Sequence, residues 1–155
     1  MKLKILCLGA LASIALPVAA FAQTATPDGP FVADGNTNLN KGGTQLACTA
    51  HFVGNISNGT GQVTSATFSG GTLGLCSTVT ATNLPWTLTA LSTTSVKISG
   101  VAVNTPIGNC SPAADLVGTF NNTTHALSFV NQALPPDCKV SGSLTTHDNA
   151  LTINP

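Results

Sequence analysis

Charged side chains are scarce in this chain, and two of the four charged residue types are missing. The sequence has no arginine and no glutamate, and lysine and aspartate together make up 6% of its 155 residues. Proteins that bind nucleic acids neutralise phosphates with clusters of lysine and arginine. A chain this poor in cations offers no such patch, so we expect no nucleic-acid partner.

Aromatic residues are also few, because tyrosine is missing and only six phenylalanines and one tryptophan are present. Carbohydrate-binding modules commonly display exposed aromatic rings. Phe52, Phe68, Phe120 and Phe129 instead lie within segments of alternating apolar and polar residues, which is typical of the buried face of a strand. The sequence therefore does not support sugar binding.

No pattern of catalytic or metal-ligating residues is evident. The histidines are scattered singly, the cysteines form no C-x-x-C pair, and there is no G-x-S-x-G nucleophile elbow. Segment 34–40 resembles the start of a calcium loop, but Leu39 and Gln45 occupy the positions of the turn glycine and the bidentate carboxylate. We therefore predict no catalytic residue, no cofactor-binding residue and no metal site. The protein is expected not to be an enzyme, with a hydrolase as the minority alternative.

The first 22 residues have the order of a secretory signal peptide. Lys2 and Lys4 precede an apolar run over 5–18, and Ala20-Phe21-Ala22 fits an A-x-A cleavage site. The run is shorter than the roughly 20 residues that span a bilayer, so no transmembrane segment is expected in the mature chain. Cleavage would leave three lysines and five aspartates, a net charge of −2 before histidine is counted. We expect a secreted, extracellular protein that could also associate with the cell surface.

Four cysteines follow the expected cleavage site, and an even number in an oxidising compartment favours two disulfides. The separation from Cys48 to Cys76 equals that from Cys110 to Cys138, at 28 residues each. This repeated interval resembles a weak internal duplication and favours pairing within each half. Four cysteines allow three connectivities, so the other two remain open at this point.

The remaining chain predicts a single all-β domain. Short runs alternate apolar and polar residues with the period of a strand, are separated by Gly, Asn and Pro clusters, and occur over 45–53, 62–69, 78–82, 86–91, 95–103, 116–120, 126–130, 139–145 and 150–153. The expected organisation is a signal peptide over 1–22, a flexible N-terminal arm over 23–43 and a β-domain over 44–155. The architecture is either an antiparallel sandwich or a Greek-key barrel with two disulfides.

Several segments in order around the four cysteines resemble one known family, the alkane oxidation activator proteins called PraB. They are Leu39-Asn-Lys-Gly, Leu46-Ala-Cys-Thr-Ala-His-Phe, Val63-Thr-Ser-Ala-Thr-Phe-Ser-Gly-Gly, Asn83-Leu-Pro-Trp, Ile98-Ser-Gly-Val-Ala-Val and Cys138-Lys-Val-Ser-Gly-Ser-Leu-Thr. The resemblance implies a secreted, non-enzymatic bacterial protein that promotes growth on long-chain hydrocarbons.

The expected partner is therefore a hydrocarbon–water interface or the cell surface, where the protein would act by surface activity or emulsification. A surface with few charges presents little electrostatic barrier to adsorption or to self-association. The alternative is an extracellular fibre or biofilm-matrix subunit that assembles by β-strand addition, with the N-terminal arm as the donated strand.

Overall fold

The computed structural model describes residues 22–147 and 151–155. The expected signal peptide, apart from Ala22, and the start of the last expected strand therefore lie outside the described residues. The described chain forms eleven strands and one 3₁₀ element: β1 (Thr24–Thr26), β2 (Gly29–Lys41), β3 (Thr44–Ser57), β4 (Thr60–Ser69), η1 (Thr72–Thr78), β5 (Thr80–Thr82), β6 (Trp86–Ser92), β7 (Ser95–Asn104), β8 (Cys110–Asn121), β9 (Ala126–Leu134), β10 (Cys138–His147) and β11 (Thr152–Asn154).

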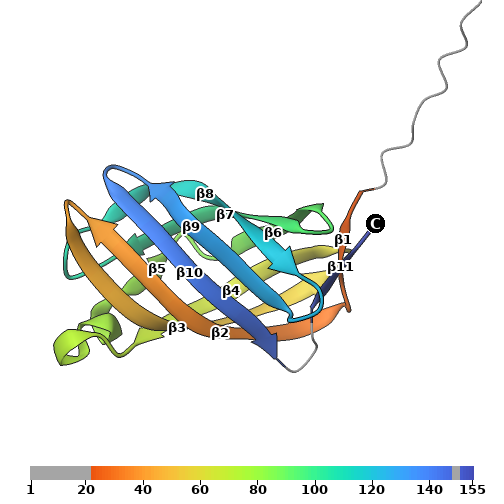
Figure 1. Cartoon of the computed structure of the whole chain (residues 1–155), viewed down its shortest axis with the longest axis horizontal. Coiled ribbons are helices and arrows are strands. Elements are labelled where there is room, and N and C mark those ends of the chain that lie inside the picture. Colours follow the sequence, from red (N-terminus) through yellow and green to blue (C-terminus); the bar gives the residue numbers. More distant parts are fainter. Residues whose placement is uncertain (1–21, 148–150) are drawn as a thin grey trace, which may run out of the picture.

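Eight of these strands close into an antiparallel barrel, shown in Figure 1. The order around the barrel is β2, β3, β4, β6, β7, β8, β9 and β10, and β10 pairs with β2 to complete the circle. The all-β prediction and the barrel alternative are therefore confirmed. Each barrel strand pairs with the next barrel strand in the chain, which is the up-and-down order rather than a Greek-key crossover.

Alternation along each strand builds the core inside the barrel. In β3, for example, every second residue from Leu46 to Ile56 is buried, while the residues between them are exposed or half-buried. Successive side chains of a strand point to opposite faces, so a period of two places one set inside a barrel. This period is the signal that predicted most of the barrel strands.

The expectation of a flexible arm over 23–43 is wrong for residues 29–41. These residues form β2, which pairs along its whole length with β3 and over ten positions with β10. The Gly, Asn and Asp content of the segment obscured its alternation, in which Phe31, Ala33 and Leu39 face inward. The polar residues 34, 36, 38 and 40 alternate with this inward set, so the segment that resembles a calcium loop is a strand.

The two ends of the barrel are closed differently. The β1–β11 ribbon covers one end with Ala25 and Ile153, joined by Leu151 just before β11, and all three are buried. Figure 1 shows η1 at the opposite end. There the ammonium group of Lys41 forms an ion pair with Asp137 and donates a hydrogen bond to a backbone carbonyl 3.1 Å away at Asn109. The Lys41 side chain therefore ties together three chain segments that meet at this end.

Candidate functional site

The barrel has a weakly paired seam beside β4. β6 pairs with β4 only at residues 61–63, so residues 64–69 of β4 have no strand partner on that side within the described chain. Short β5 lies across from them, but it pairs with residues 102–104 of β7. The wall of the barrel is therefore not joined by backbone pairing between β4 and β5.

A surface groove of about 370 Å³ follows this seam. Its floor and rims carry no charged side chain and consist of Thr64, Ser65, Ala66, Thr67, Phe68, Ser77, Val79, Thr80, Ala81 and Leu84. The groove therefore lies on the outer surface of the barrel, over the seam.

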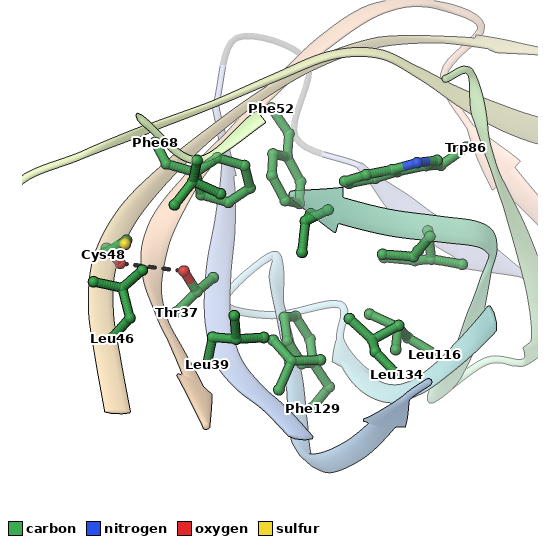
Figure 2. Close-up of a pocket in the computed structure, with 15 residues that line it drawn as sticks. Thr37, Leu39, Leu46, Cys48, Phe52, Phe68, Trp86, Leu116, Phe129 and Leu134 are labelled. Carbon is green, nitrogen blue, oxygen red and sulfur yellow. Dashed lines mark hydrogen bonds between the residues drawn. The ribbon is translucent and has the colours of Figure 1, made fainter. Parts of the chain in front are cut away.

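An apolar cavity of about 50 Å³ lies on the inward side. Of the fifteen residues that line it, only Thr37 and Trp86 carry a polar side-chain group. The Thr37 hydroxyl donates a 3.3 Å hydrogen bond to the backbone carbonyl of Cys48, and the Trp86 indole N–H donates a 2.9 Å hydrogen bond to the backbone carbonyl of Thr82. Figure 2 shows Phe52, Phe68 and Trp86 on one side of the cavity, with Leu39, Phe129 and Leu134 on the other. The cavity is a hydrocarbon-like space whose two polar side-chain groups are already hydrogen-bonded.

Two residues line both the groove and the cavity, Phe68 on β4 and Val79 between η1 and β5. Phe68 packs edge-on against Phe52, with the ring centroids 6.1 Å apart. Phe52 in turn lies edge-on to Trp86, at a centroid distance of 5.7 Å. Phe68 and Val79 are both half-buried, so each is in contact with the cavity on one side and with solvent on the other. A single layer of side chains therefore separates the cavity from solvent at the seam.

The 3₁₀ element η1 presents an exposed apolar tip beside this groove. Leu73 is 95% exposed and has a backbone φ of 57°, a left-handed conformation that costs a residue with a Cβ about 1 kcal/mol. The neighbouring Leu75 is 38% exposed. The disulfide from Cys76 to Cys48 fastens η1 to β3, so the two leucines project from a covalently anchored turn.

The groove and the tip belong to a larger surface without charge. No Asp, Glu, Lys or Arg occurs between positions 42 and 96, a stretch that contains β3, β4, η1, β5 and β6. Because β3, β4 and β6 are neighbours in the barrel, these elements form a continuous region, which we call the uncharged wall. Four of the six exposed large hydrophobic side chains in the described chain lie on it: Leu73, Leu75, Leu84 and Leu91.

The titratable groups lie chiefly elsewhere. Asp34 on β2 is hydrogen-bonded to His51 on β3, with 2.5 Å between Oδ1 and Nδ1, and its Oδ2 lies 3.8 Å from Nε2 of His147 on β10. All three side chains are at least 40% exposed. In the part of the chain that the structure describes, no group of three or more His, Cys, Asp or Glu is arranged to hold a metal ion.

The predicted disulfide cysteines are brought together as the spacing favoured, in the bonds Cys48–Cys76 and Cys110–Cys138. The seam, the cavity and the leucine tip were not predicted from the sequence. One signal for the tip was available, since Leu73 and Leu75 flank a glycine in a turn between two strands, where an apolar side chain has no strand face to join.

Among the described residues, no helix is both long and apolar enough to cross a membrane. Comparisons with curated proteins and with solved structures give no match. The model of one protein family matches residues 1–155, and that family is described as alkane oxidation protein activator, PraA/PraB-like. Since the match spans the whole chain, with its four paired cysteines, the protein belongs to the PraA/PraB-like family of alkane oxidation protein activators.

Proposed function

We propose that this protein is secreted and promotes the use of alkanes without catalysing a reaction, by adsorbing at the hydrocarbon–water interface through its uncharged wall. The observation that carries the proposal is Leu73, which is almost fully exposed in a strained backbone conformation on an uncharged, disulfide-anchored turn. Strain of this kind in an exposed apolar residue is a recognised sign of a functional position.

The physics of adsorption fits the distribution of charge. Transfer of one exposed leucine side chain from water into oil stabilises the adsorbed state by about 1.5–3 kcal/mol. Burial of a charge at the same surface would cost several kcal/mol, and the uncharged wall contains no Asp, Glu, Lys or Arg; its single histidine, His51, lies at the edge beside Asp34 of β2. Asp34 on β2 and Lys97 on β7 lie on the two strands that flank the wall, and Asp115 lies on β8 beyond Lys97, so these charges can stay in water at its margin.

Growth on hexadecane tests the function as a whole. A strain that lacks the gene should grow more slowly on hexadecane, and addition of the purified mature protein to the medium should restore growth. The variant Leu73→Asn should restore it less well, whereas Val130→Thr, a polar change at an exposed position of β9 outside the uncharged wall, should restore it fully. Equal rescue by both variants would contradict a role for the wall.

The unpaired edge of β4 favours a second candidate function, assembly into extracellular fibres or biofilm matrix by strand addition. Residues 64–69 offer backbone groups that do not pair with β6, and no lysine is present on this edge to oppose the addition of another strand. Because β2 is built into the barrel, the N-terminal arm is no longer the natural donor. Electron microscopy of culture supernatant should then show filaments that disappear with Thr67→Lys, and monomers throughout would contradict this function.

A further inference from the structure

We infer that the barrel interior takes the end of a single alkyl chain, which enters through the seam between β4 and β5 past Phe68. This inference rests on the proposed function and extends it from adsorption at an oil surface to binding of an individual hydrocarbon chain. The residues that carry it are Phe68 and Val79, because they alone line both the outer groove and the inner cavity.

The chemistry of the cavity selects a chain without a polar group. Apart from the Thr37 hydroxyl and the Trp86 indole N–H, the side chains around it are apolar, and these two groups already donate to the backbone carbonyls of Cys48 and Thr82. A carboxylate or hydroxyl moved into this space would find no side-chain partner, at a cost of several kcal/mol for the charged group. The cavity therefore favours the methyl end of an alkane over the head of a fatty acid or alcohol.

The size of the cavity shows that entry requires Phe68 to move. An engineered protein cavity of about 150 Å³ binds benzene, whereas the cavity beside Phe68 measures about 50 Å³. Phe68 lies on the length of β4 that has no partner across the seam, so its ring can turn outward without breaking a pairing in that direction. A smaller space of about 20 Å³ adjoins the cavity across Phe52 and Ile98 and continues the path along the barrel.

The location of the seam couples the two roles. The groove opens on the uncharged wall, so a molecule adsorbed through this wall holds the entrance against the oil. Cys48 lines the cavity, and its disulfide to Cys76 fixes the η1 turn that borders the groove. Adsorption through Leu73 and occupancy of the cavity are thus separate events at neighbouring places.

Trp86 provides a direct readout, since it is the single tryptophan of the chain, is buried and lines the cavity. The probe is 1-bromohexane, dissolved below its aqueous saturation so that no oil surface exists. Bromine quenches tryptophan fluorescence at contact. We expect saturable quenching for the wild-type protein. For Phe68→Ala, the apparent Kd should fall about fourfold for each further methylene that the widened cavity buries, which corresponds to about 0.8 kcal/mol.

Two further variants separate this inference from the proposed function. Val79→Ala opens the same entrance from the other side and should also lower the apparent Kd, so the test does not depend on the folding of Phe68→Ala. Leu73→Asn should leave the quenching unchanged while it weakens adsorption to oil. Quenching that rises linearly with 1-bromohexane, equally in wild type and both entrance variants, would overturn chain binding and leave interfacial adsorption intact.

Discussion

Phe68 and Phe52 meet edge to face with their ring planes at 83°, and this contact forms the boundary between the barrel interior and the seam. Phe52 is 7% exposed and also touches Trp86, whereas Phe68 is half-buried. One ring of the pair therefore belongs to the core and the other to the entrance.

This difference predicts unequal effects of truncation on stability. Phe52→Ala should lower the free energy of unfolding by about 3–5 kcal/mol, the usual cost for a buried phenylalanine. Phe68→Ala should cost clearly less, because its ring is already partly in water. Urea denaturation followed by circular dichroism measures both values. Equal losses would show that Phe68 is a core residue and not a mobile one.

Leu73→Asn should separate stability from surface activity. Asparagine tolerates the left-handed conformation that strains leucine at φ 57°, so the free energy of unfolding should stay the same or rise by up to about 1 kcal/mol. Adsorption to hexadecane droplets should fall, because the most exposed apolar side chain of the uncharged wall is lost. Thermal unfolding and droplet depletion assays measure the two effects, with Val130→Thr as the matched control. Destabilisation of Leu73→Asn by more than 1 kcal/mol would contradict the strained conformation.

Gly35→Ala tests the placement of β2 in the barrel. A Cβ at Gly35 would lie 1.9 Å from the backbone oxygen of Ser143 on the neighbouring strand β10, so the two strands would have to separate. We expect a loss of more than about 2 kcal/mol in unfolding free energy, or failure to fold. Asn36→Ala, an exposed position of the same strand, should be nearly neutral. A neutral Gly35→Ala would mean that residues 29–41 form a flexible arm after all.

Removal of either disulfide should lower the free energy of unfolding by a similar amount, but only removal of Cys48–Cys76 should weaken adsorption to oil. Both bonds span 28 residues, and a closed loop of this length is worth about 3–4 kcal/mol in the chain-entropy account. The pair Cys48→Ala and Cys76→Ala should also weaken adsorption, because it frees η1. The pair Cys110→Ala and Cys138→Ala should not. Chemical denaturation and droplet binding at a temperature where both variants are folded make the comparison.

The sequence was sufficient for the parts of the fold that depend on local periodicity and cysteine spacing. Alternation identified strands such as β3 and β7, and the equal intervals favoured the correct disulfides. β2 was missed because inward Gly35 and Thr37 interrupt its apolar face, and glycine is needed there only because β10 passes so close.

The candidate site could not be predicted from the sequence because it depends on backbone pairing that is missing between strands and on space that side chains leave unfilled. The seam exists because β6 leaves β4 after three residues, and the cavity exists because fifteen residues from distant strands do not fill the barrel completely. Neither property is encoded in a local pattern around Phe68 or Val79. The uncharged stretch over 42–96 was visible in the sequence, but only the barrel order shows that it forms one continuous wall.

The most direct test of the central claim is the interfacial tension of a hexadecane drop in a solution of the purified mature protein. Wild-type protein should lower the tension, Leu73→Asn combined with Leu75→Asn should lower it much less at the same concentration, and Val130→Thr should behave as wild type. No change in tension with the wild-type protein, or identical curves for all three, would contradict adsorption through the uncharged wall.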